Sequence, residues 1–380
     1  MGIALTSIIF LTTYSGVPRT IRMAKVLGEL GHKVMILEWD RASSKLPFEV
    51  EDNIDFVRMG LKAPYGIKAC FLFPCWIIFV TVFLLVRRFD AVQPRNLDCL
   101  IPAWLTSRIL RRRFRIVYDL ADFYSDSYVV EIPLVRRLSE ALEKILIKRV
   151  DGLITATDKS AIQIGATNIP ENWMVLYNSP ESAEYRGENE EKEGDKLSLF
   201  YGGIFGKDRT NLLSVIKAIR NVNTVEFLIA GFGEYQRLFE NISKNLANVR
   251  FLGKIPHSEV MRLSSSADLI IIPFNSAYRN VRVSLPNKFF EAIALGKPLI
   301  VPKNTYMAEL CSKFQFGISV DYTDIDEIKR AVLLLRDESL RNELSKNART
   351  AYLQEFSWDI LKTRLIKFYQ NVLSRASQSL

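Results

Sequence analysis

Short apolar runs alternate with amphipathic segments along nearly the whole chain, and this alternation limits the possible folds more than any other feature. In the first half the runs are IALTSIIFLT, KVMILEW, FDAVQP, FRIVYDL and DGLITAT, each followed by a helical pattern. The first helix, within GVPRTIRMAKVLGELGH, has Pro18 suited to its first turn and Gly31 to its end. Repeated strand–helix units build a parallel sheet covered on both faces, so we predict a doubly wound α/β domain.

The pattern restarts after a strongly charged stretch, which indicates a second domain of the same class. Its predicted strands are LSLFYGGIF, VEFLIAGFG, VRFLGKI, ADLIIIPF, PLIVPK and GISVDY, and a long amphipathic helix ends the chain. We expect the first of these to pass into a turn at its glycines. We expect domains at 1–180 and 197–352, a charged linker at 181–196 and a C-terminal helix at 353–380. Doubly wound sheets bind ligands at the carboxyl ends of their strands, so two facing sheets would form a cleft.

Positive charge is concentrated in the first part of the 380 residues. The net charge is +9, and residues 1–150 hold 22 Lys and Arg against 15 Asp and Glu. Much of the excess lies between Arg111 and Arg115, which is either a patch for a polyanion or a solvated helix end. Four cysteines without CxxC spacing and only two histidines argue against a disulfide framework, a zinc site and most histidine chemistry. A reducing cytosol fits this cysteine usage.

One apolar segment, KACFLFPCWIIFVTVFLLVRR (residues 68–88), has the composition of a membrane helix. A helix with Pro74 in its first turn has only Cys75 to Val86 as its apolar body. That body is about 18 Å long at ~1.5 Å per residue, against a hydrocarbon core of ~30 Å. Because FDAVQP follows as a strand of the same sheet, we expect a crossover helix instead of a spanning one.

The same helix is apolar on every side, so packing on the sheet leaves one apolar face over. Arg88 closes the segment, and the cluster from Arg111 to Arg115 follows in the same domain. An apolar face edged with cations suits an anionic membrane surface. We expect monotopic attachment to the inner face of the cell membrane through residues from Pro74 to Arg88 and from Arg111 to Arg115. The alternative is burial against another part of the protein or a subunit.

The segment SLPNKFFEAIALGKPLIVP (residues 284–302) resembles the retaining GT-B glycosyltransferases of family 4, the glycosyl transferases group 1. YGGIFGKDRTNLLSVIKAI, FLIAGFGEY and VRFLGKIPHSEVMRLSSSADLIIIPF follow the order of that family's donor domain, and YDLADFYSD and DGLITATDKSA resemble its first domain more loosely. The resemblance implies two Rossmann-like domains facing across a cleft, with the last helix crossing back onto the first. It also implies a UDP- or GDP-linked sugar donor, with no further cofactor and no metal.

Two basic residues and two glycines suit the diphosphate of such a donor. Lys288 lies at the start of a predicted helix, a position suited to phosphate, and Arg209 follows the GGIFGKD loop. Gly202 and Gly203 would let the backbone approach the diphosphate closely. We predict that Lys288 and Arg209 bind the donor and stabilise the leaving group. Each could instead be an ordinary solvated charge.

Further donor contacts are predicted beside these. The resemblance implies that Glu291 accepts hydrogen bonds from the ribose hydroxyls. A carboxylate can accept two such bonds at once. Many members carry another Glu where Val283 stands, so Ser284 and Asn287 would contact the sugar or diphosphate here. GxG in the AGFGE segment predicts a chain turn beneath the base, or only a tight turn. The glycines concerned are Gly231 and Gly233.

The first domain offers fewer polar candidates. The resemblance implies that the turn with Gly16 faces the donor phosphate and the acceptor. Arg19 either contacts phosphate or is a charge on a helix face. Many relatives have a His where Ala121 stands, so Asp119 and Asp122 are the nearest acceptor-side candidates. Asp122 could take the acceptor proton as a catalytic base, or it could simply cap the following helix.

Three functions remain open from the sequence. The first is a retaining, metal-independent hexosyltransferase that transfers sugar to a glycan or lipid-linked acceptor at the cytoplasmic membrane face. The second is a soluble glycosyltransferase with the apolar helix buried. The third is a glycan-binding protein of impaired catalysis. A nucleic-acid partner is disfavoured, because the basic cluster lacks interleaved aromatic residues.

Overall fold

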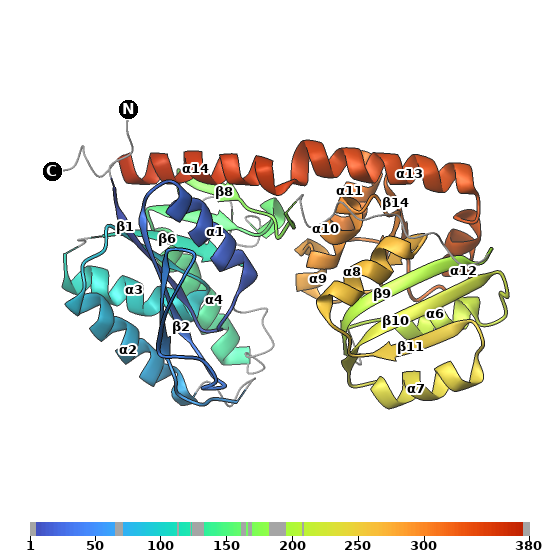
Figure 1. The fold of residues 1–380 in the computed structure, drawn as a ribbon, viewed down its shortest axis with the longest axis horizontal. Helices are drawn as coiled ribbons and strands as arrows, with labels where there is room; N and C mark the ends of the chain where they lie inside the picture. The colour runs from blue at the N-terminus through green and yellow to red at the C-terminus, as the bar shows by residue number, and fades with distance from the viewer. Residues whose placement is uncertain are drawn as a thin grey trace. The chain divides into compact units, whose positions relative to one another are not determined.

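The computed structural model describes residues 5–64, 71–111, 114–121, 123, 133–160, 165, 169–181, 195–206 and 209–374. The chain forms two compact units (Figure 1). The first contains residues 1–177 and 361–380, and the second contains residues 178–360. Most of the predicted linker, 181–196, lies outside the described residues.

The first unit is built on an eight-stranded sheet in the order β3-β4-β2-β1-β5-β6-β7-β8. Every neighbouring pair is parallel except the β3–β4 hairpin at one edge. The strands are β1 (Ser7–Thr12), β2 (Lys33–Trp39), β3 (Phe48–Glu51), β4 (Ile54–Met59), β5 (Ala91–Pro94), β6 (Arg115–Leu120), β7 (Gly152–Thr155) and β8 (Trp173–Val175). The helices are α1 (Pro18–Glu29), α2 (Phe73–Val86), α3 (Leu97–Ile109), α4 (Pro133–Ile147) and α14 (Trp358–Ser374).

The second unit has a six-stranded parallel sheet in the order β11-β10-β9-β12-β13-β14. The predicted pair of doubly wound α/β units is therefore confirmed. Its strands are β9 (Leu197–Phe205), β10 (Val225–Gly233), β11 (Val249–Gly253), β12 (Leu269–Ile271), β13 (Leu299–Pro302) and β14 (Gly317–Val320). Its helices are α6 (Leu212–Ile219), α7 (Gln236–Asn245), α8 (His257–Ser266), α9 (Arg279–Val283), α10 (Asn287–Ala294), α11 (Tyr306–Phe314), α12 (Ile325–Leu334), α13 (Glu338–Ala351) and a π-helical turn (Tyr352–Phe356).

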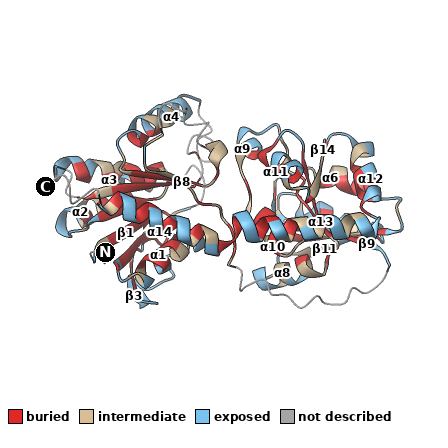
Figure 2. Ribbon diagram, turned by 90° about the horizontal axis from the view of Figure 1, so that it is seen from above, coloured by how far each residue is buried: buried red, intermediate tan, exposed pale blue. Residues whose placement is uncertain are grey.

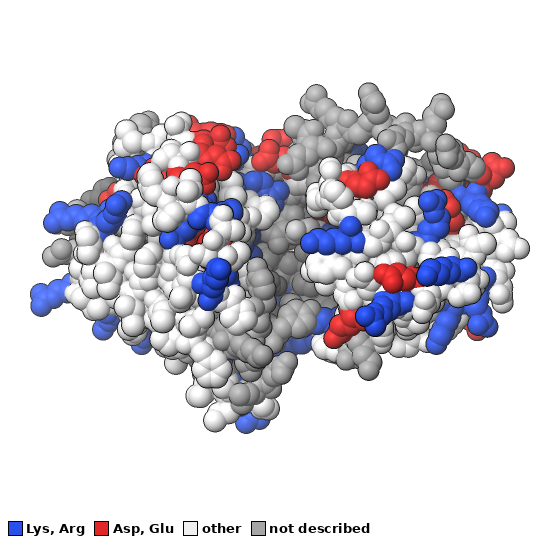
Figure 3. All heavy atoms as spheres, turned by 60° about the horizontal axis from the view of Figure 1, so that its bottom comes forward, with Lys and Arg blue, Asp and Glu red and all other residues white. Residues whose placement is uncertain are grey.

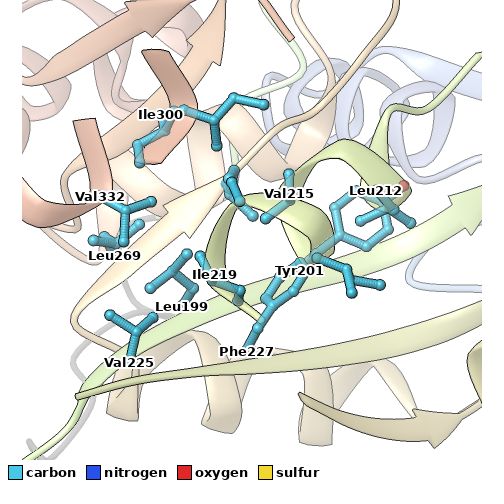
Figure 4. Close-up of a cluster of buried hydrophobic side chains, with 14 of the residues drawn as sticks. Leu199, Tyr201, Leu212, Val215, Ile219, Val225, Phe227, Leu269, Ile300 and Val332 are labelled. Carbon is cyan, nitrogen blue, oxygen red and sulfur yellow. The ribbon is translucent and has the colours of Figure 1, made fainter. Parts of the chain in front are cut away.

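Each sheet buries its own apolar core. In the second unit, side chains of β9, β10, α6 and α12 interdigitate between sheet and helices (Figure 4). In the first unit the strands β1 and β2 are almost fully buried, because helices cover both of their faces. Continuous apolar strands of this kind are what a parallel sheet covered on two faces requires.

Helix α14 belongs to the first unit from Leu361 onward. One side of it is buried along its length (Figure 2). Gly152 makes room for it, since a Cβ at that position would lie 2.7 Å from the ring of Phe368. Tyr369 donates a hydrogen bond to Gln93 in β5, and Lys362 pairs with Glu29 at 2.6 Å. The C-terminal helix is thus fixed to the first sheet by shape and by polar contacts.

Helix α2 is the crossover between β4 and β5, which lie in one sheet, as the sequence predicts. Its first turn contains Pro74. Among the described residues, no helix is long and apolar enough to cross a bilayer.

Candidate functional site

Glycines hold β9 and β10 unusually close. Gly231 is in register with Gly203, and Gly233 with Phe205. A Cβ on Gly231 would lie 1.8 Å from the carbonyl oxygen of Gly203, and one on Gly233 would lie 1.8 Å from that of Phe205. Both glycines have positive φ, +139° and +155°. They therefore lie inside a continuous strand that admits no side chain there, and a role beneath the donor base stays a prediction.

Lys288 lies at the switch point of the second sheet. The strands after β9 are added on one side as β10 and β11, and on the other side as β12 to β14. From the second position of α10, the Lys288 ammonium lies 3.9 Å from the ring centroid of Tyr201 in β9 and 5.1 Å from that of Phe274 beyond β12. A Cβ at Gly203, where φ is +146°, would lie 2.5 Å from the Lys288 Nζ. The ammonium thus occupies the room that glycine leaves.

The surroundings of Lys288 hold its pKa far below the ordinary lysine value. The side chain as a whole is half-buried, whereas its ammonium end is enclosed by aromatic rings. Loss of hydration lowers the pKa to about 7, and attraction to Glu291 offsets only part of that effect. A phosphate anion beside this ammonium would restore the proton, because an opposite charge favours the charged form.

The start of α10 gathers the other predicted donor contacts. Pro286 precedes the helix without a side-chain cap, and Asn287 is its exposed first residue. Ser284 ends α9, where its backbone N–H is bonded to Asn280. The buried side chain of Phe289 anchors the helix in the core. The uncapped amides at this helix start are donors of the kind that bind anions.

Glu291 is one turn further along α10 and has a partner that the sequence reasoning missed. His257 Nε2 lies 3.1 Å from Glu291 Oε1. The Glu291 side chain is 15% exposed and that of His257 is 68% exposed, so the pair is at the surface of the site. His257 begins α8, directly after Pro256. No local signal in the sequence links it to Glu291, which is 34 residues away.

Arg209 is tied to the same region through its backbone. The Asn275 N–H donates to the carbonyl of Arg209, and Thr210 bridges to Phe274, whose ring faces Lys288. The Arg209 guanidinium lies 5.5 Å from the Tyr278 ring centroid. Residues 207 and 208 of the preceding loop lie outside the described residues. Gly202 is closely packed, since a Cβ there would lie 2.7 Å from Val260.

The donor-side cluster can therefore bind an anion next to a diol. Lys288 and the start of α10 provide positive charge and N–H donors, and Glu291 provides an acceptor one helical turn away. In the part of the chain that the structure describes, no group of three or more His, Cys, Asp or Glu side chains could hold a metal ion.

In the first unit, the turn that contains Gly16 is held by a buried carboxylate. Gly16 has φ +70°, and its N–H donates to Glu38 Oε2 at 3.0 Å. Ser15 donates to the other Glu38 oxygen at 2.7 Å, and Arg58 pairs with that oxygen at 2.6 Å. The turn is therefore pre-formed between β1 and α1, where its positive φ suits glycine.

Arg19 and Asp119 form a buried ion pair with each other. The Arg19 side chain is 5% exposed and that of Asp119 is fully buried, with the Nη2–Oδ1 distance at 2.9 Å. Arg19 also donates from Nε to both Asp119 oxygens and from Nη1 to the carbonyl of Leu176. In this arrangement both side chains fix α1 to the ends of β6 and β8, and a substrate contact of either one stays a prediction. Asp122, the predicted base, lies outside the described residues.

The outer face of α2 is apolar and exposed. Trp76, Val80 and Leu84 are buried against the sheet, and the residues on the opposite side are 40–78% exposed: Ile78, Val82, Leu85 and Val86. A hollow of about 600 Å³ on this side is lined by Cys75, Ile78, Phe79, Val82, Phe83, Val86 and Arg87. In Figure 3, uncharged side chains cover much of the face that the first unit (left) presents, with lysines and arginines spread around it.

Comparison with known proteins identifies relatives of both units. Residues 181–351 match the family described as glycosyl transferases group 1. The chain is 24% identical over 368 residues to N,N'-diacetylbacillosaminyl-diphospho-undecaprenol alpha-1,3-N-acetylgalactosaminyltransferase of Campylobacter jejuni, over 91% of this chain and 88% of the relative. It is 26% identical over 165 residues to GDP-mannose-dependent monoacylated alpha-(1-6)-phosphatidylinositol monomannoside mannosyltransferase of Corynebacterium glutamicum, over 42% of this chain and less than half (43%) of the relative.

Solved structures match across nearly the whole chain. Sucrose-phosphate synthase from Thermosynechococcus elongatus superposes with a TM-score of 0.74 at 14% identity, over 97% of this chain and 100% of that protein. At this identity the likeness establishes the fold. The two Rossmann-like units have the GT-B fold.

Proposed function

We propose that this chain, whose residues 181–351 match the glycosyl transferases group 1, transfers a sugar from a UDP- or GDP-linked donor to a glycan or lipid-linked acceptor. The observation that carries the proposal is the meeting of Lys288, Gly203 and Glu291 at the switch point of the second sheet. Retention of the anomeric configuration is part of the proposal and rests on the family resemblance.

In the proposed reaction, breakage of the anomeric C–O bond leaves negative charge on the nucleoside diphosphate. Lys288 and Arg209 are the cations that would balance this charge, so the scheme requires no metal ion. Lys288 would gain a proton as the diphosphate binds, because its pKa is about 7 in the free protein. Glu291 would accept hydrogen bonds from the ribose hydroxyls. The departing phosphate would take the acceptor proton on the same face.

A lipid-borne acceptor at the cytoplasmic face of the membrane completes the proposal. Two of the curated relatives are named for acceptors that carry a lipid, an undecaprenyl diphosphate and a phosphatidylinositol mannoside. The exposed face of α2 supports membrane contact, and so does α4, where Leu134 and Leu138 are 66% and 62% exposed. The cysteines Cys75, Cys99 and Cys311 are free, which suits a reducing compartment.

The test of catalysis is a panel of nucleotide sugars with a lipid-linked acceptor, read by mass spectrometry. We expect Lys288→Ala and Glu291→Ala to lose transfer, and the exposed-residue controls Lys244→Ala and Glu343→Ala to keep it. Full activity of the two site variants would refute the donor-site assignment. Glycan binding without any transfer by the unaltered protein would favour the non-catalytic alternative.

The membrane part has its own test by vesicle flotation. Ile78→Ser with Val82→Ser should reduce binding to vesicles of phosphatidylcholine and phosphatidylglycerol in equal parts. The matched control is Leu334→Ser, an equally exposed position (56%) in the second unit. Equal flotation of all three proteins would exclude α2 as the contact.

A further inference from the structure

Two arginines of the first unit are largely enclosed and lack a salt bridge among the described residues. Arg41 is 7% exposed and Arg95 is half-buried. Within the described residues neither forms a salt bridge, and the Nε atom of each is buried without a hydrogen-bond partner. A guanidinium taken out of water without an anion is costly, so such a pair calls for an anionic ligand.

Both arginines lie at the carboxyl ends of the two parallel strands that flank β1. Arg41 follows β2 by two residues, and Arg95 follows β5 directly, with its N–H bonded to the Leu11 carbonyl in β1. The strand order around them is β2-β1-β5. The chain runs from β1 to β2 on one side and later reaches β5 on the other, so this is the switch point of the first sheet. Doubly wound sheets bind ligands at such points.

Two further polar atoms at this place lack partners. They are the side-chain carbonyl oxygen of Asn96 and the Oδ1 of Asp98, both buried. Asn96 has φ +62° and ψ 171°, a conformation that costs non-glycine residues free energy and occurs mainly at functional sites. It immediately precedes α3, and its side chain does not cap the first amides of that helix.

The balance of charge at this point is positive. Asp98 is the carboxylate that faces the two arginines: both favour its ionised form, although burial raises its pKa overall, and Thr13 donates to its Oδ2 at 2.8 Å. The acids next to Arg41 in sequence are engaged elsewhere, since Glu38 pairs with Arg58 and Asp40 accepts backbone N–H bonds within its own turn. Two guanidinium groups therefore face one carboxylate.

The site formed by Arg41 and Arg95 borders the apolar helix α2. The Arg41 guanidinium lies 4.5 Å from the ring centroid of Tyr14, 4.8 Å from that of Trp39 and 5.9 Å from that of Phe73, the first residue of α2. Trp39 in turn stacks on Trp76 of α2 with 6.0 Å between centroids. An anion held by Arg41 would thus have the start of an exposed apolar helix beside it.

We propose that Arg41 and Arg95 bind the phosphate or diphosphate of a lipid-borne acceptor, whose hydrocarbon chain runs along α2. The inference deepens the function proposed above and rests on it, because it names the acceptor class. A lipid phosphate fits better than a free phosphate, since the Arg41 charge lies beside the first turn of the apolar helix α2.

The test is calorimetric titration of the full chain with farnesyl diphosphate, inorganic pyrophosphate and farnesol. UDP and GDP are present in excess, so that the donor site is filled. We expect Arg41→Gln and Arg95→Gln each to weaken farnesyl diphosphate binding about tenfold or more, as loss of a charge-assisted bond does. Arg108→Gln, an exposed arginine of α3, is the matched control and should bind like the unaltered protein. Farnesol should not bind at this site.

Thermal unfolding without ligand separates binding from folding. Removal of a half-buried charge that forms no salt bridge should leave the melting temperature of Arg95→Gln unchanged or higher, whereas a purely structural arginine would lower it. Undiminished farnesyl diphosphate binding in both variants would overturn the proposal. Equal affinity for pyrophosphate and farnesyl diphosphate would overturn its lipid part. If the donor-site assignment is wrong, the Lys288→Ala variant will show full sugar transfer in the transfer assay. That result would leave these titrations unaffected.

Discussion

Lys288→Met should make the second unit more stable while it weakens donor binding. In the folded protein the Lys288 ammonium is enclosed by Tyr201 and Phe274, and its pKa is lowered from 10.5 to about 7. Methionine keeps the apolar stem and removes the charge. The fold then no longer desolvates an ammonium, but the diphosphate loses its cation. Stability and donor binding are therefore expected to change in opposite directions.

The pKa shift sets the size of the effect. One pKa unit corresponds to about 1.4 kcal/mol, so a shift from 10.5 to about 7 bounds the cost of the buried charge at about 5 kcal/mol. The side chain is half-buried, and solvent screening reduces the expected gain to about 2–3 kcal/mol. In a unit of this size each kcal/mol raises the melting temperature by about 2–4 °C.

The gain should depend on pH in a defined direction. Below the folded pKa of about 7, Lys288 is charged in both the folded and unfolded chains, and the full cost applies. Between that pKa and 10.5 the unfolded chain binds more protons, so the stability of the unaltered protein rises with pH. The advantage of Lys288→Met should therefore shrink as pH rises from about 6 to about 9.

Urea unfolding of both proteins across this pH range measures the difference, and other titrating groups cancel in the comparison. Lys244→Met, at an exposed position of α7, is the control and should show no pH-dependent difference. A less stable Lys288→Met protein, or an advantage that does not change with pH, would refute the reasoning that the ammonium is desolvated.

Three further substitutions test separate contacts. Gly231→Ala should cost more than about 3 kcal/mol or prevent folding, because its Cβ would lie 1.8 Å from the Gly203 carbonyl oxygen; denaturant unfolding reports it. His257→Ala should raise the donor KM about 2–10-fold through loss of one hydrogen bond to the site, with thermal stability unchanged. Arg19→Met should cost about 3–5 kcal/mol in the free energy of unfolding, because Asp119 would be left buried without a counter-charge.

The strands of both sheets were largely predictable because each is a buried apolar run. The run LSLFYGGIF, however, was expected to pass into a turn at its glycines, and β9 instead continues through them to Phe205. The β3–β4 hairpin was not predicted at all. The sequence signal for this hairpin is the dipeptide Asp52–Asn53, because these residue types tolerate the positive φ of a two-residue turn. In the structure both have positive φ, and they join strands that pair Glu51 with Ile54.

Contacts that span the sheets could not be predicted from spacing. Arg19 and Asp119 are 100 residues apart and meet only because α1 and the end of β6 converge. The pair His257 and Glu291 depends in the same way on how the start of α8 faces α10. A charged residue on a short sequence segment has the same local pattern whether it binds a ligand, pairs with a distant acid or faces water.

The glycines of the second unit show what a sequence cannot predict about a glycine. A glycine is required wherever a Cβ would collide, and the sequence does not say with what. For Gly231 the colliding group is the backbone of β9, so its absence of a side chain is explained without any ligand. For Gly203 the colliding group is the Lys288 ammonium, so this glycine is explained by the candidate site itself. Because the Gly203 carbonyl is also the group that Gly231 accommodates, strand pairing and the position of the Lys288 ammonium depend on the same two residues.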